Sequence, residues 1–238
     1  AQGSFLKSAE INTTLGTVVA CPTCTTSCSQ CPTIQSIFVN SCNGSGAEQD
    51  NEFIILHSGS GFNAANFQLT YNPTNSIGAA NLGINITGSS CSLQTPTAAL
   101  MDSIRSNTGC DTNNTKRVLP SATIPPNSYV IFFCSSNVTK KYDFSNICAS
   151  GLVLYVMQSS CQRTSGAFTN GASTTTPPQT TILGLSNCSS CIDTFNYSRV
   201  GLSNVDGEYA VRHPSGISTK ANGGVAINSL NPCNGPLA

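Results

Sequence analysis

The stretch EFIILHSGSGFNAANFQLTY, residues 52–71, is decisive for the fold class of this chain. It contains two short apolar runs, at 52–57 and 67–71, and the residues between them are mainly Gly, Ser, Asn and Ala. Short runs rich in Ile, Phe, Thr and Tyr and bounded by turn-forming residues are typical of β-strands. The stretch therefore predicts two strands separated by a polar turn region.

The same pattern recurs along the chain. Seven further strands are predicted, at Ile34–Asn40, Gly83–Thr87, Ser128–Cys134, Gly151–Gln158, Thr180–Leu185, Ile192–Ser198 and Tyr209–Arg212. A helical period is clear only at Thr97–Ser106, and residues 88–97 and 163–179 are polar loops. Short, irregularly spaced strands with one short helix predict an all-β, immunoglobulin-like two-sheet sandwich with long polar loops.

Charge is scarce in this chain. Of its 238 residues, 8% are charged, against about 25% in an ordinary soluble domain, and the formal net charge is zero. No basic run exists, so the electrostatic signature of a nucleic-acid or membrane-surface binder is missing. No apolar run approaches the roughly 18 residues of a spanning helix. We therefore expect that the protein neither binds nucleic acid nor spans a membrane.

Cysteine usage points to an oxidising compartment. The thirteen cysteines are disulfide candidates and lie at Cys21, Cys24, Cys28, Cys31, Cys42, Cys91, Cys110, Cys134, Cys148, Cys161, Cys188, Cys191 and Cys233. Cysteines spread along a whole chain are typical of extracytoplasmic proteins, so we expect a secreted or cell-surface location. An odd number leaves at least one thiol free, bound, or linked to another chain.

The segment CPTCTTSCSQC, residues 21–31, has three possible roles. Zinc ribbons separate their two C-x-x-C pairs by about 15–20 residues, whereas three residues separate them here. Redox C-x-x-C motifs stand at the start of a helix, and no helical period follows this segment. Disulfides are the preferred interpretation, and we expect them to tie residues 1–31, an extended N-terminal arm, to a sandwich formed by residues 32–238.

The arm carries an apolar stripe of its own. In an extended segment Ile11, Leu15 and Val19 lie on one face. Three interpretations stay open. The segment could be an edge strand of its own sandwich, a strand donated to a neighbouring subunit, or a disordered arm.

Several positions match short glycan-acceptor patterns. Asp102-Ser103-Ile104 resembles the acceptor for O-linked glycans in one bacterial phylum, which makes Ser103 a candidate. Seven Asn-x-Ser/Thr triplets are candidates for N-linked glycans, and they begin at Asn12, Asn43, Asn85, Asn113, Asn137, Asn187 and Asn196.

The sequence offers no catalytic constellation. It lacks the G-x-S-x-G, H-E-x-x-H, Walker and G-x-G-x-x-G patterns, and its two histidines stand at predicted strand ends. We therefore expect no enzyme and no cofactor. Glu48, Asp50 and Glu52 alternate, and in an extended strand they would share one face. There they could form part of a calcium site or a charged strand end that blocks edge aggregation.

Several stretches resemble lamin-tail-like domains of secreted Bacteroidota proteins. These are IQSIFVNSCNGSGAEQDNEFIILHSGSGFNAANFQLTYN (34–72), ATIPPNSYVIFFCSSN (122–137), YDFSNIC (142–148) with GLVLYVMQ (151–158), GAFTN (166–170) and IDTFNYSRVGLSNVDGEYAVRHPSGISTKANGG (192–224). The resemblance covers about residues 32–228. It implies an immunoglobulin-like sandwich that serves as an adhesive or structural module.

Two functions follow as expectations. The first is a secreted structural or adhesive protein, the repeating subunit of an extracellular filament that self-associates into a homopolymer by N-terminal strand exchange. The alternative is a surface module that binds glycan or a partner protein through its loops.

Overall fold

The structure is a computed structural model. It describes residues 30–41, 48–71, 75–77, 90–139, 142–162, 166–168, 179–200, 202, 206–213 and 216–220. The predicted strand at 83–87 and the arm residues up to 29 lie outside these ranges, as do Ile11, Leu15, Val19, Asn12, Asn43 and Asn85.

The larger sheet has eight strands in the order β15-β14-β1-β2-β10-β11-β7, with β8 also paired to β11. Most neighbours are antiparallel, but β10 and β8 each run parallel to β11. The strands are β1 (Thr33–Asn40), β2 (Phe53–His57), β7 (Leu93–Gln94), β8 (Thr115–Arg117), β10 (Tyr129–Phe133), β11 (Leu154–Ser159), β14 (Glu208–His213) and β15 (Gly216–Lys220).

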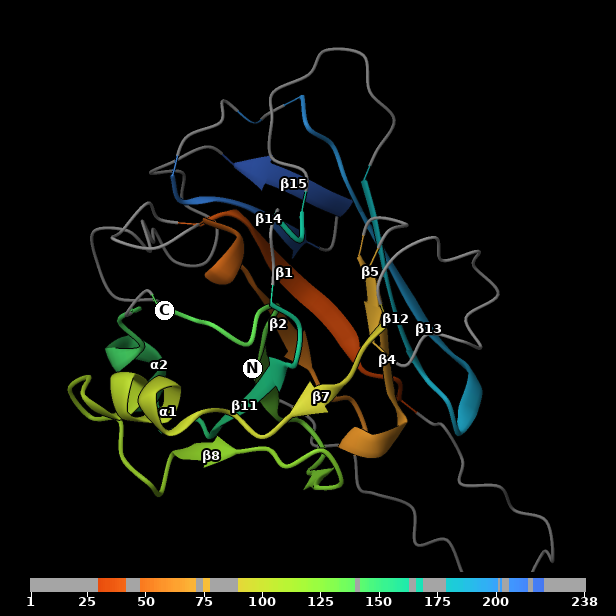
Figure 1. The fold of residues 1–238 in the computed structure, drawn as a ribbon. Helices are drawn as coiled ribbons and strands as arrows, with labels where there is room; N and C mark the ends of the chain where they lie inside the picture. Colours follow the sequence, from red (N-terminus) through yellow and green to blue (C-terminus); the bar gives the residue numbers. More distant parts are fainter. Residues whose placement is uncertain are drawn as a thin grey trace, which may run out of the picture.

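The smaller sheet has the order β13-β12-β4-β5-β6 and packs against the larger one (Figure 1). Its strands are β4 (Phe67–Tyr71), β5 (Asn75–Ile77), β6 (Ser90–Cys91), β12 (Gln179–Leu185) and β13 (Cys188–Tyr197). A separate two-stranded ladder joins β3 (Phe62–Asn63) to β9 (Thr123–Ile124). The predicted all-β sandwich is confirmed.

The larger sheet is buried on both faces. Its inner face packs on the smaller sheet, where Phe132 belongs to one apolar cluster with Leu69, Leu183 and Phe195. Its outer face packs on the helices, where the adjacent residue Phe133 belongs to a second apolar cluster. A strand covered on both sides needs apolar residues at successive positions, which is why YVIFF shows no polar alternation.

Two helices cover the outer face of the larger sheet: α1 (Ala98–Arg105) and α2 (Ser145–Ala149). The predicted helix at 97–106 is confirmed, with Thr97 as its N-cap, whose Oγ1 accepts from the Leu100 N–H at 3.2 Å. The sequence analysis missed α2 because five residues are too few to display a 3.6-residue period.

Three disulfides cross-link the described chain. Cys31 pairs with Cys191, Cys91 with Cys161 and Cys110 with Cys148, at sequence separations of 160, 70 and 38. Cys188 is disulfide-bonded as well, with a partner outside the described residues, where Cys21, Cys24, Cys28, Cys42 and Cys233 also lie. Cys134 is buried and belongs to none of the three described disulfides.

The acidic triplet does not form the predicted extended strand. Residues Glu48–Asp50 form a 3₁₀ turn, η1, so the three carboxylates do not share one face. Asp50 accepts from Ser135 Oγ at 2.7 Å and from Asn137 Nδ2 at 3.2 Å. Glu52 is fully buried and accepts from the backbone N–H groups of Ala167 and Phe168. The single shared face predicted for these three carboxylates is therefore wrong.

A matched pair of glycines tests the packing of the β2–β3 turn. Gly59 and Gly151 both have positive φ, at 58° and 77°. A Cβ at Gly59 would lie 2.4 Å from the Gln30 carbonyl oxygen, whereas a Cβ at Gly151 would meet nothing within 4 Å. We expect Gly151→Ala to lower the free energy of unfolding by about 1 kcal/mol, and Gly59→Ala by about 3 kcal/mol because of the added overlap.

Chemical denaturation of the oxidised protein checks this difference. If the two variants lost the same free energy of unfolding, the backbone of residues 30–31 would not pack closely against this turn.

Candidate functional site

The outer edge of the smaller sheet is formed by β13. Among the described strands β13 pairs with β12 alone, and Figure 1 shows it along one side of the molecule. Its side chains alternate: Cys191 and Phe195 are buried, whereas Thr194 and Ile192 are exposed, the latter by 51%. The strand therefore has one face in the core and one neutral face in solvent.

A group of inward side chains, here called the cross-sheet latch, ties β13 to the larger sheet. The latch comprises the Cys31–Cys191 disulfide, Asp193, Arg212 and the backbone of Ile34. Arg212 Nη2 lies 2.8 Å from both carboxylate oxygens of Asp193. Arg212 Nε donates to the Ile34 carbonyl at 2.8 Å, and the Ile34 N–H donates to Asp193 Oδ2 at 2.6 Å.

The latch is partly withdrawn from water, with side-chain exposures of 31% for Arg212 and 13% for Asp193. The guanidinium also lies 5.4 Å from the centroid of the Phe195 ring. Charges at such a site are stable only when their hydrogen-bonding groups find partners, and here strands β1, β13 and β14 supply them. The latch therefore ties β13 to the larger sheet through the inward-facing side chains of β13, in addition to the pairing of β13 with β12.

The outer edge of β13 keeps its strand geometry without a described partner. The strand β15 approaches it, but no strand pairing joins the two among the described residues. Backbone N–H and C=O groups along a sheet edge are a template for pairing with another strand. The edge of this ten-residue strand, with its neutral outward side chains, is a candidate assembly surface.

A pocket of about 380 Å³ lies at the end of β13 next to the β12–β13 turn. Three buried apolar residues lie in its wall: Phe62, Ile124 and Leu185. Its exposed lining includes the polar residues Gln30, Thr123 and Asn187. None of the described residues that line it is charged. The pocket therefore favours a neutral group with an apolar part.

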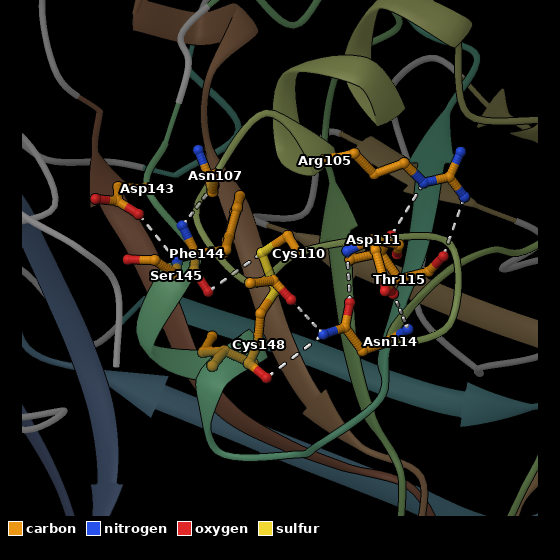
Figure 2. Close-up of a disulfide and its surroundings, with 12 residues drawn as sticks. Arg105, Asn107, Cys110, Asp111, Asn114, Thr115, Asp143, Phe144, Ser145 and Cys148 are labelled. Atoms are coloured by element: carbon orange, nitrogen blue, oxygen red, sulfur yellow. Dashed lines mark hydrogen bonds between the residues drawn. A yellow bond between two sulfur atoms is a disulfide. The ribbon is translucent and has the colours of Figure 1, made fainter.

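The second cross-linked region lies at the opposite face, around Cys110–Cys148 (Figure 2). Asn114 Nδ2 donates to the Cys148 carbonyl at 3.4 Å, and its Oδ1 accepts from the Asp111 N–H at 2.8 Å. Asp111 Oδ1 accepts from the N–H groups of Asn113, at 2.6 Å, and Asn114, at 3.1 Å. These backbone donors hold the pKa of Asp111 below its usual value.

The described glycan candidates are all at least partly accessible. Ser103 on α1 is half-buried, and the exposed candidates are Asn113, Asn137, Asn187 and Asn196. Asn113 Nδ2 donates to Asp111 at 3.2 Å, and Asn196 Oδ1 accepts from Thr180 Oγ1 at 2.8 Å. Glycosylation at any of these positions stays a prediction.

The histidines occupy strand ends. His57 Nδ1 accepts from the Gly59 N–H at 3.3 Å and its ring packs edge-on against Tyr129, while His213 ends β14. Within the described ranges no group of three or more His, Cys, Asp or Glu side chains could hold a metal ion. No described helix is long and apolar enough to cross a membrane.

Comparison with known proteins returned no relative: no family model, no curated protein and no solved structure matches this chain. The resemblance to lamin-tail-like domains therefore stays a prediction.

The sequence analysis missed the latch, although one signal was available. In the predicted strand at 192–198 and the residues just before it, Asp193 falls on the same face as Cys191 and Phe195. A carboxylate on an otherwise apolar face indicates a buried partner. The identity of that partner, Arg212, cannot be read from the sequence, because the two residues meet only through sheet packing.

Replacing Arg212 measures the strength of the latch. We expect Arg212→Ala to lower the free energy of unfolding by about 2–3 kcal/mol, because Asp193 and the Ile34 carbonyl lose their donors. Arg212→Lys keeps the charge but cannot reach both acceptors, so a loss of about 1 kcal/mol is expected. Arg117→Ala, at an exposed position of β8, is the control, with an effect within about 0.5 kcal/mol.

Urea denaturation followed by circular dichroism gives these differences. If Arg212→Ala proved as mild as Arg117→Ala, the latch would not stabilise the fold.

The lowered pKa of Asp111 makes a prediction about acid stability. A depressed native pKa means that the ionised carboxylate stabilises the fold above its unfolded-state pKa, and that this contribution is lost as pH falls through the native value. We expect Asp111→Asn to lower Tm at about pH 6, and the gap from the wild type to close by about pH 2. Differential scanning calorimetry across this range checks it, and a gap that does not change with pH would contradict it.

Proposed function

We propose that this protein is a secreted structural subunit of an extracellular homopolymer. Residues 11–19 of one copy add as a strand to the outer edge of β13 in the next copy. The observation that carries the proposal is the edge itself: ten residues long, fixed by the cross-sheet latch and neutral on its outer face.

The disulfides support the proposed extracellular location. Three described pairs and the bonded Cys188 span most of the described chain, from Cys31 to Cys191. Such bonds form and persist outside the reducing cytosol. A heavily cross-linked domain also resists local opening, which is useful to a subunit exposed to the environment.

Neutrality supports self-association. The chain has zero formal net charge, and residues 11–20, INTTLGTVVA, contain no ionisable side chain. Copies of such a chain do not repel one another over long distances. Edge strands in monomeric proteins usually carry charges that prevent pairing, and the outward residues Ile192, Thr194 and Asn196 of β13 carry none.

Strand addition through this arm leads to an open polymer. The donor segment and the acceptor edge are different surfaces, so the growing assembly keeps one unused donor segment at one end and one unused acceptor edge at the other after every addition. Residues 20–29 separate the donor segment from the described body. Ten extended residues reach about 33 Å, enough to cross to an adjacent subunit.

Two full-length variants with similar starting residues test the acceptor edge. Ile192 on β13 and Leu152 after α2 are exposed by 51% and 44%. We expect Ile192→Lys to abolish polymers or to shorten them by about tenfold, because a charge on the edge strand disfavours pairing. Leu152→Lys should leave polymer length unchanged. Electron microscopy and sedimentation velocity measure the lengths.

The donor segment is tested in the same assay with a triple variant, Ile11→Asp, Leu15→Asp and Val19→Asp. This variant should remain monomeric because three carboxylates replace its apolar stripe. A wild-type chain that stays monomeric at all concentrations would overturn the proposal. Specific glycan binding by that monomer would favour the recognition function instead.

A further inference from the structure

The pocket at the end of β13 has rigid walls. A Cβ at Gly61 would lie 2.6 Å from the Ile124 carbonyl oxygen, and a Cβ at Gly59 would lie 2.4 Å from that of Gln30. Backbone segments that approach this closely leave little room for rearrangement. The Ser58 hydroxyl also donates to the Pro125 carbonyl at 2.8 Å. The described walls of the pocket are therefore closely packed, and a closely packed wall lowers the entropic cost of binding.

The residues that line the pocket favour an uncharged ligand with an apolar part. Phe62, Ile124 and Leu185 offer buried apolar surface, and no described lining residue is charged. At about 380 Å³ the pocket exceeds the roughly 150 Å³ cavity that accommodates benzene in another protein. An aliphatic side chain with its adjoining backbone suits this size. The amide and hydroxyl groups of Gln30, Thr123 and Asn187 could pair with that backbone.

The root of the N-terminal arm lies at the same place. Gln30, the first described residue, lines the pocket, and its carbonyl accepts from Ser60 N at 2.9 Å and Ser60 Oγ at 2.8 Å. The next residue, Cys31, is bonded to Cys191 in β13. The described chain therefore begins at the lining of this pocket, and the arm, residues 1–29, is joined to it there along the chain.

The donor segment has the properties that the pocket selects. Residues 11–19 are uncharged, and if this segment pairs as an extended strand, its apolar side chains Ile11, Leu15 and Val19 share one face. They are four residues apart, or about 13 Å, so only one of them can enter a single pocket. A strand that runs along the edge of β13 arrives at the pocket where β13 begins, at Cys188 and Cys191.

We propose that this pocket is the anchor site of the assembly, where one apolar side chain from residues 11–19 of a neighbouring copy inserts. The inference rests on the proposed function and extends it, because it assigns the occupant of the pocket. Pairing along a sheet edge depends mainly on backbone groups and leaves the register poorly determined. A side chain buried in a fixed pocket determines the register.

Photo-crosslinking in the full-length chain tests the occupant. p-Benzoylphenylalanine replaces Thr123, an exposed residue in the lining, in an equal mixture of ¹⁴N- and ¹⁵N-labelled chains. The control carries the same group at Thr112, which is also exposed but lies in the turn near the Cys110–Cys148 disulfide. We expect mixed-isotope crosslinks from position 123 to residues 11–19, and none from position 112.

A second pair of variants makes the test independent of the photo-reactive group. Thr123→Trp should fill the pocket and weaken polymerisation by about tenfold or more, whereas Thr112→Trp should not change it. Circular dichroism and Tm confirm that both variants are folded.

The outcomes separate the two proposals. Crosslinks within a single chain, or to another part of the second copy, would overturn the anchor assignment while polymers still form. Polymers of normal length from Thr123→Trp would overturn it too. Absence of any polymer from the wild-type chain would overturn both.

Discussion

The ion pair between Asp193 and Arg212 ties the outer strand of the smaller sheet, β13, to the larger sheet. Arg212 reaches from β14 in the larger sheet to Asp193 on β13 in the smaller one, and both bind the backbone of Ile34 in β1. The pair is partly withdrawn from water, so loss of either charge would leave the other in a poorly solvated site without its ionic partner. The adjacent Cys31–Cys191 disulfide joins the same two sheets covalently. Together they hold β13 by its inner face.

This arrangement explains why β13 can be both stable and exposed. A strand at a sheet edge is usually held by ladder hydrogen bonds on one side and by packing on one face. Here the packing face includes a salt bridge and a disulfide, so the strand does not need a second neighbour to stay in place. The outward residues of β13 are neutral, and so are the described residues that line the pocket next to the β12–β13 turn. The proposed assembly uses both features: backbone groups for affinity and the pocket for register.

The burial of the larger sheet on both faces places the candidate site on the smaller sheet. Helices α1 and α2 cover one face of the larger sheet, and the smaller sheet covers the other. The disulfide Cys110–Cys148 and the hydrogen bonds of Asp111 and Asn114 cross-link the turn after α1 to α2. Among the described strands, β13 is the longest one at the edge of a sheet, and Gln30, the first described residue, lies near its beginning.

By itself the sequence determined the fold class, most strand positions, the helix at 97–106 and the disulfide chemistry, because these follow from local periodicity, turn residues and cysteine number. It failed for η1, where alternation of Glu48, Asp50 and Glu52 suggested a strand, and for α2, which is too short to display a period. Tertiary structure alone decided that Cys31 meets Cys191, that Asp193 meets Arg212 across 19 residues, and that Gln30 shares a pocket with Asn187. Such contacts arise where two sheets pack, and packing brings together residues whose separation along the chain carries no signal of their distance in space.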